Sequence, residues 1–263
     1  MAIAEQKIVE PLNLDKYFGP DGIRVRNRIR LVGIELEGGF VKFPAGEKYE
    51  HDGSVFKPES YGGQVEWDQL KMKIASLKIT TTGEIPSAPM LPAQMRAWIT
   101  KNYPDFTDKT CGLHVHMSFE DLKHYNRLMT PEYPITMRTY LKKWAVEEHL
   151  PDDHPIWDRV NGNNMYCSSK FWPDKQVGKK KSYDHGEGDR YTDINYCWKE
   201  HKTIECRILP MMSDAALAYR AAKRVLDITN ATLVKITRRE KKELEEVGNI
   251  PTSKYVERDV EEV

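Results

Sequence analysis

The sequence lacks an excess of charge of either sign. It contains 40 Lys and Arg residues and 40 Asp and Glu residues among 263, so its formal net charge is zero. Chains that coat nucleic acid generally carry a basic surplus. The composition therefore gives no indication of a broad nucleic-acid surface, although a modified nucleobase stays open as a small substrate.

Cysteine is scarce, and its spacing suits no cysteine-based scaffold. The four cysteines are Cys111, Cys167, Cys197 and Cys206, and no two of them form a CxxC pair. In a chain of this length such spacing argues against a disulfide framework and favours a reducing compartment. Zinc bound by Cys111 and the nearby His114 is disfavoured too, since structural zinc sites use four Cys or His ligands.

Long hydrophobic runs are also missing. No apolar stretch reaches the length needed to cross a bilayer. The first residues, MAIAEQKIVEPLNLDKYFG, contain no apolar core and no cleavage signature of a signal peptide. We therefore expect a cytoplasmic protein without membrane segments.

What is present suits a folded domain with a well-solvated surface. Hydrophobic residues make up 40% and charged residues 30% of the chain, which supplies enough apolar side chain for a core. We expect an N-terminal arm over residues 1–27, a main domain over 28–248 and a charged tail over 249–263. Residues 161–190 are rich in Gly, Asn, Lys and Ser. They are predicted to form a long loop or lid over a functional site, because long loops in compact domains are often functional.

Hydrophobic periodicity predicts a mixture of strands and helices. Strands are expected over 28–41, once or twice within 64–85, over 111–119, and as a hairpin within 191–210. Helices are expected over about 93–103, over 135–149, and from the start at Ser213 and Asp214 to about Val247. The predicted fold is α+β, with a curved, mainly antiparallel sheet whose concave polar face holds the site and whose other face packs against helices.

Three of the expected strands place two polar residues two positions apart. The pairs are Glu35 and Glu37, His114 and His116, and Glu205 and Arg207. Side chains at i and i+2 of a strand point to the same face, while the apolar residues between them face the core. If the three strands share a sheet, the polar faces converge, and Glu84 adds a carboxylate from another strand.

A cluster of this composition favours divalent metal ions and phosphoryl transfer. Gathered carboxylates repel one another unless cations neutralise them. Carboxylates with a minority of imidazoles suit Mg²⁺ or Mn²⁺ better than zinc, and Arg207 beside them is suited to a transferring phosphoryl group. Each pair alone is more often a solvated strand face or a surface ion pair; the three together favour a functional site.

The order of several short segments resembles a known family. GIELE, DGS, GEIPSAP, GLHVHMSF and TIECRILP follow one another within residues 31–210. This series is similar to the amidoligase family of carboxylate–amine and carboxylate–ammonia ligases, a group that includes glutamine synthetase and glutamate–cysteine ligase. HVHMS is the most specific segment, whereas GIELE and DGS are short.

The resemblance implies roles for individual residues. The metal ligands would be Glu35, Glu37, Glu84, His114 and Glu205. Contacts to ATP or substrate would come from His116, Arg190, Asn195 and Arg207. Catalytic roles would fall to Arg207, Glu205 and Asp52. Thr203 departs from glutamine synthetase, which has an Arg there, and Glu66 is expected to be a surface residue.

The activity that the resemblance implies is ATP-dependent amide formation through an acyl-phosphate. ATP and Mg²⁺ or Mn²⁺ would be the cofactors, and a carboxylate and an amine the substrates. A metal-dependent hydrolase or phosphatase with the same site, and a degenerate nucleotide-binding or scaffold protein, are the alternatives. The loop sequences identify neither the two substrates nor the oligomeric state.

Overall fold

The structure is a computed structural model, and it describes residues 9–18, 23, 25–164, 167, 192–197 and 201–246. The strands are β1 (Ile29–Phe40), β2 (Thr81–Pro86), β3 (Gly112–Phe119), β4 (Ile194–Cys197) and β5 (Thr203–Pro210). The helices are α1 (Asp15–Phe18), α2 (Gln64–Ser76), α3 (Met95–Asn102), α4 (Leu122–Leu128), α5 (Glu132–Glu147), α6 (Ile156–Val160) and α8 (Ala215–Glu246), with 3-10 turns η1 (Pro58–Ser60) and η2 (Pro92–Gln94).

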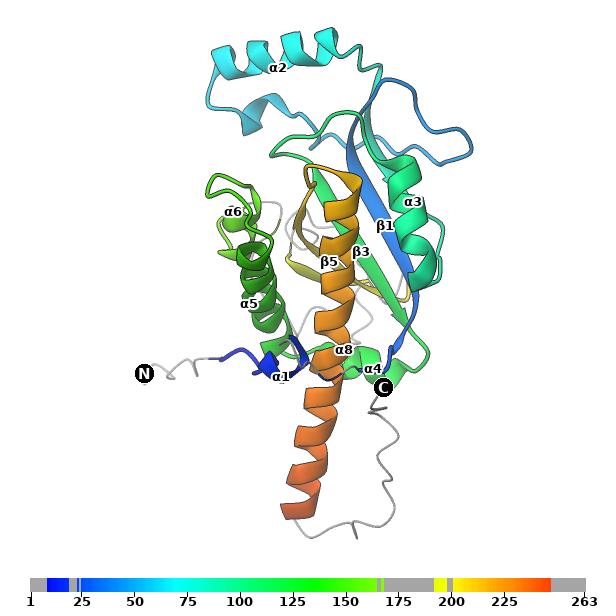
Figure 1. The fold of residues 1–263 in the computed structure, drawn as a ribbon, viewed down its shortest axis with the longest axis vertical. Coiled ribbons are helices and arrows are strands. Elements are labelled where there is room, and N and C mark those ends of the chain that lie inside the picture. Colours follow the sequence, from blue (N-terminus) through cyan, green and yellow to red (C-terminus); the bar gives the residue numbers. More distant parts are fainter. Residues whose placement is uncertain are drawn as a thin grey trace, which may run out of the picture.

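All five strands belong to one open antiparallel sheet in the order β2-β1-β3-β5-β4. The predicted α+β class and the antiparallel sheet are confirmed. The long strands β1 and β3 form the centre of the sheet, and β5 lies beside β3 (Figure 1). This order places the three strands with the polar pairs next to one another.

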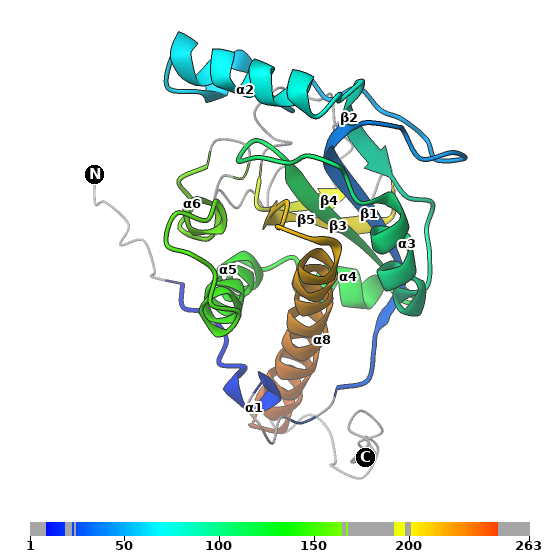
Figure 2. The same ribbon diagram turned by 45° about the horizontal axis from the view of Figure 1, so that its top comes forward.

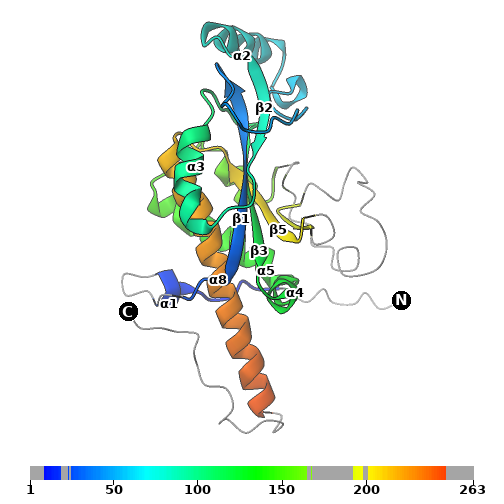
Figure 3. The same cartoon turned by 90° about the vertical axis from the view of Figure 1, so that its right-hand side faces the viewer.

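Helices cover one face of the sheet. Helices α3 and α8 lie on the same side of β1 and β3 in the edge-on view (Figure 3), and α5 packs beside α8. The residues of the central strands that face them are fully or almost fully buried: Ile34, Leu36, Val115, Ile204 and Cys206. The prediction that these five side chains form the apolar face is confirmed, and burying them is the main source of stability.

Helix α8 begins where the sequence indicated. Asp214 Oδ1 accepts a hydrogen bond from the backbone N–H of Leu217, at 2.8 Å, which caps the first turn. The helix then runs along the sheet and projects beyond it at its carboxyl end (Figures 1 and 2). Among the described helices, none combines the length and apolarity needed to cross a lipid bilayer.

Of the one or two strands predicted within residues 64–85, the structure contains one, and a strand in the first half of the segment is wrong. Residues Gln64–Ser76 form helix α2, and only Thr81–Pro86 form a strand. Trp67, Leu70 and Ile74 are the residues of α2 that pack against the core, at a spacing of three and four. Val65 and Met72 are exposed.

The segment before the sheet packs against α5. The backbone N–H of Leu14 donates to the Tyr140 hydroxyl at 2.6 Å, and Leu14 is completely buried. Most of the predicted covering loop at 161–190, and the tail at 249–263, lie outside the described residues.

Candidate active site

The strand register brings the predicted polar residues onto one face. Glu35 of β1 pairs with His114 of β3, and His116 of β3 pairs with Glu205 of β5. Directly paired residues of neighbouring antiparallel strands have their side chains on the same face, about 5 Å apart. The alternation that buries Leu36 and Val115 on the helix side therefore gathers these four side chains on the opposite side.

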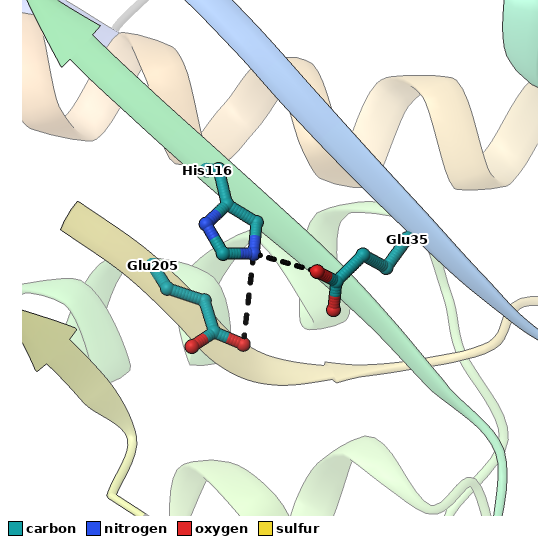
Figure 4. Close-up of side chains that lie close together, drawn as sticks. All are labelled: Glu35, His116 and Glu205. Atoms are coloured by element: carbon teal, nitrogen blue, oxygen red, sulfur yellow. Dashed lines mark hydrogen bonds and ion pairs between the residues drawn. The ribbon is translucent and has the colours of Figure 1, made fainter. Parts of the chain in front are cut away.

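Glu35 lies between the two imidazoles. Its Oε2 is 2.9 Å from His114 Nδ1, and its Oε1 is 3.0 Å from His116 Nε2. Glu205 approaches from the third strand, with Oε1 at 3.6 Å from His114 Nδ1 and 3.9 Å from His116 Nε2. Figure 4 shows Glu35, His116 and Glu205 converging from three strands.

Glu37 extends the cluster along β1. Its side chain is only 3% exposed, its Oε2 accepts the backbone N–H of Gly112 at 2.5 Å, and its Oε1 lies 3.4 Å from His114 Nε2. The charges of Arg159 and Arg207 also act on Glu37, but no Lys or Arg is in direct contact with it among the described residues, so its burial is only partly compensated. Glu37 is therefore a suitable partner for a cation.

Carboxylates crowd at the β2 end of the site. Glu84 pairs with Glu37 across the sheet, and the backbone of Glu50 forms a bridge to Glu84. Burial, followed by the charges of Glu35, Glu37 and Asp52, raises the pKa of Glu84 to about 9. Such a shift arises where negative charges share a desolvated site without cationic compensation.

Arg207 and Asn195 lie at the β5 and β4 end of the cluster, where both contact Glu205. Arg207 Nη1 lies 2.6 Å from Glu205 Oε1, and Asn195 Nδ2 donates to Glu205 Oε2 at 3.0 Å. Arg207 Nε and Asn195 Oδ1 are buried, and neither has a hydrogen-bond partner among the described residues. Unpaired buried polar atoms at a site are candidates for contacts with a ligand or water.

The charged groups of the cluster shift one another's pKa values. Burial would raise the pKa of Glu35, but hydrogen bonds from His114 and His116 hold it well below its usual range. Burial likewise opposes ionisation of Glu205, yet Arg207 and then His116 lower its pKa. For His116, burial favours the neutral form, but Glu205 and Glu35 raise its pKa overall. The cluster thus holds ionised carboxylates in a desolvated environment.

Three overlapping sets of side chains place potential ligand atoms within 4.8 Å of one another. They are Glu35–His116–Glu205, Glu35–Glu84–His114 and Glu37–Asp52–Glu84. Carboxylate oxygens predominate, with one imidazole in two of the sets, which fits Mg²⁺ or Mn²⁺. The raised pKa of Glu84 fits as well, because a bound cation would relieve the crowding of negative charge.

The structure gathers nearly all of the predicted site residues. Those brought together are Glu35, Glu37, Asp52, Glu84, His114, His116, Asn195, Glu205 and Arg207. Arg190 lies outside the described residues. Thr203 contributes a hydroxyl 3.2 Å from His116 Nδ1. Glu66 is exposed and pairs with Lys109 at 3.4 Å, as expected for a surface residue.

The sequence did not point to two residues behind the site. Arg159 of α6 donates to backbone carbonyls of β5, and the Asp193 carbonyl accepts the backbone N–H of Arg207 at 3.0 Å. Asp193 is itself buried against Arg138, with 2.6 Å between Oδ2 and Nη1. Arg159 lies outside any alternating polar pattern. Asp193 stands two positions before Asn195 around Ile194, so the alternation used for the other strands could have identified it.

Comparison with known proteins found no relative of this chain. No family model matches the sequence, and no curated protein and no solved structure is significantly similar to it.

Gly83 allows the segment that contains Asp52 to approach β2. Its φ is +156°, and a Cβ there would lie 2.6 Å from the Glu50 carbonyl oxygen. We expect Gly83→Ala to lower the free energy of unfolding by about 1–3 kcal/mol, as for other overpacked sites. Urea denaturation measures this. Gly53→Ala is the control, because a Cβ there meets nothing within 4 Å; equal losses in both variants would contradict the prediction.

Proposed function

We propose that this protein is an ATP-dependent carboxylate–amine ligase that forms an amide through an acyl-phosphate at the Glu/His cluster. The observation that supports this most directly is the composition of the cluster. Glu35, Glu205 and His116 converge from three adjacent strands, and Arg207 lies 2.6 Å from Glu205. Phosphoryl transfer uses this combination of acidic metal ligands and a guanidinium.

The reaction would proceed in two steps. An oxygen of the substrate carboxylate attacks the γ-phosphorus of ATP, and the bond to ADP breaks. The nitrogen of the amine then attacks the acyl carbon, inorganic phosphate leaves, and the nitrogen gives up a proton. Bound Mg²⁺ or Mn²⁺ would neutralise the phosphate oxygens.

The protein's own groups have distinct tasks in this scheme. Arg207 binds the γ-phosphoryl oxygens, where negative charge is redistributed as the phosphoryl group moves. His116 and Asn195 lie next to Glu205 and orient the phosphate chain from either side. Asp52 belongs to the acidic end of the site and is the candidate to bind the amine and accept its proton, while Glu84 beside it would help to hold a cation.

The order of the family-like segments agrees with the arrangement of the site. GIELE lies on β1, GEIP on β2, HVHMS on β3 and TIECR on β5, and these strands are neighbours in the sheet. Glutamine synthetase builds its site on a similar series of strands, so we extend the proposal to a glutamine synthetase-like catalytic fold.

The test is nucleotide turnover that depends on both substrates. Purified protein is screened with ATP, Mg²⁺ or Mn²⁺, and pairs of carboxylates and amines, with ADP measured and products identified by mass spectrometry. Replacement of the amine by hydroxylamine should trap the acyl-phosphate as a hydroxamate. Glu205→Gln, which removes one negative charge from the cluster, should abolish both signals.

Other outcomes would overturn the proposal in different ways. Phosphate release that needs metal but no amine, with no hydroxamate formed, would make the protein a metal-dependent hydrolase or phosphatase. Binding of nucleotide without any turnover across the screen would make it a nucleotide-binding protein that has no ligase activity.

A further inference from the structure

Arg159 is a buried cation that contacts the back of the site. It belongs to the short helix α6 and is only 3% exposed. Its Nη1 donates to the carbonyl oxygens of Arg207 at 3.2 Å and Leu209 at 3.0 Å, and its Nη2 donates to the carbonyl oxygen of Cys111 at 3.3 Å. One guanidinium thus joins the end of β5 to the residue that precedes β3.

The contacted part of β5 is irregular. Leu113 pairs with Leu209 and Val115 pairs with Cys206, so two residue steps on β3 correspond to three steps on β5. This is a β-bulge, which disrupts the ladder, turns the strand and changes the direction of a side chain. Arg207 lies within the bulge, and Arg159 binds the carbonyl of that same residue.

Among the described residues, no carboxylate is in direct contact with Arg159, although the charge of Glu37 acts on it from a distance. Among the described parts of the chain it forms no ion pair, and its Nε has no hydrogen-bond partner. Burying a charge without a contacting ion-pair partner is costly, and an apolar residue of similar volume often serves the fold as well. Hydrogen bonding to the bulge explains why a guanidinium is buried at this position, which packing alone does not explain.

We propose that Arg159 is a positioning residue that fixes the β5 bulge and thereby aims the Arg207 guanidinium at the transferring phosphoryl group. The inference rests on the proposed function for its chemical consequence. Its structural part, the placement of Arg207, stands independently. Displacement of a catalytic group by about 1 Å can lower turnover by about 10²-fold.

A double-mutant cycle separates positioning from general stabilisation. Arg159→Met should lower kcat by about 10–100-fold and change KM little, as for other residues that orient a functional group. In the Arg207→Ala background, Arg159→Met should cause no further loss of kcat, because the group that it aims is gone. Arg159→Lys should restore part of kcat, since an ammonium can still donate to one or two of the carbonyls.

Arg224→Met is the matched control. The Arg224 side chain is 12% exposed, and its Nε is also buried without a partner, but it lies on α8 over the Phe18 ring, away from the cluster. This variant should lose stability without altering kcat. Losses from Arg159→Met that simply multiply with those from Arg207→Ala would make Arg159 a structural residue and overturn the inference.

A spectroscopic readout keeps the inference testable without turnover. The Nε–Hε resonance of Arg207, assigned by its disappearance in Arg207→Lys, should move or broaden in Arg159→Met and partly recover in Arg159→Lys. An unmoved resonance in both variants would overturn the positioning inference even in an active ligase. A moved resonance in a protein with no ligase activity would uphold it and reject only the proposed function. If Arg159→Met does not fold, Arg159→Lys carries both measurements.

Discussion

Arg207→Ala is expected to lower the kcat of amine-dependent ADP release by about 10²–10³-fold, the usual loss when one transition-state donor is removed. Arg207 is largely buried, and its Nη1 lies 2.6 Å from Glu205. Arg207 lies on the same face of the sheet as the candidate metal-binding carboxylates. Its charge stabilises the γ-phosphoryl group most strongly while that group is being transferred. Nucleotide affinity should fall less, because metal ions and other contacts hold the ground state.

Two further variants sharpen this prediction. Arg207→Lys should recover activity only in part, because an ammonium cannot reproduce the planar fork of a guanidinium. Arg220→Ala is the control, since Arg220 forms an exposed ion pair with Glu148 on the helix side of the sheet. Steady-state ADP release and nucleotide binding are measured for all variants. Equal losses in affinity and turnover would make Arg207 a ground-state binder, and full activity would remove it from the site.

The strands that form the site could be predicted because their pattern is local. Glu35 and Glu37, or His114 and His116, alternate with apolar residues, and alternation alone determines which side chains share a face. The pairing of Glu35 with His114 in the structure then follows from two long strands that both bury their apolar faces under α8 and α3. Matching of polar and apolar faces was sufficient to predict the cluster.

Helix α2 shows where such reasoning fails. A strand was expected in this segment, but the helical spacing of Trp67, Leu70 and Ile74 determines the conformation. In a segment with few apolar residues and a weakly hydrophobic face, both patterns fit the sequence. Tertiary contact decides between them, and the sequence alone does not contain that information.

The bulge in β5 was equally invisible to periodicity. A strand with one extra residue reads like a regular strand, so Arg207 was placed correctly on the site face without any indication of how it is held. Its supports come from residues distant in sequence, including Arg159 and the Asp193 carbonyl. Long-range contacts to backbone atoms leave no pattern in side-chain chemistry, which explains why Arg159 was missed.

The cluster differs from an ordinary ion-pair network in the balance of its charges. In the part of the site that the structure describes, the carboxylates of Glu35, Glu37, Asp52, Glu84 and Glu205 gather with two imidazoles and the Arg207 guanidinium, and Arg159 lies behind β5. A stable buried network would compensate each charge. Here the compensation is incomplete at the β2 end, where burial and neighbouring carboxylates raise the pKa of Glu84. The deficit of positive charge is what a divalent cation would supply.

Mn²⁺ is therefore expected to stabilise the protein, and Glu35→Gln to remove that effect. A ligand at about 100 times its Kd adds about 2.7 kcal/mol to the free energy of unfolding. For a chain of this size each kcal/mol raises Tm by about 2–4 °C, so wild type should gain several degrees in a thermal melt. Glu35 and Glu84 each belong to two of the three candidate ligand sets. Of the two, Glu35 is the one whose pKa is held well below its usual range, so its negative charge is available to a cation.

Glu35→Gln keeps the shape of the side chain and removes one negative charge, so the loss of the Mn²⁺ shift would report on metal binding rather than on packing. The same change should lower amine-dependent ADP release by about 10³-fold, which is the upper end of the loss for a single electrostatic contact to the transition state. Glu66→Gln is the matched control, because Glu66 is an exposed carboxylate paired with Lys109 on the surface. It should keep both the Mn²⁺ shift and the activity. A Glu35→Gln variant that retains the wild-type shift would show that Mn²⁺ binds without Glu35, and it would reject the two candidate ligand sets that contain this residue.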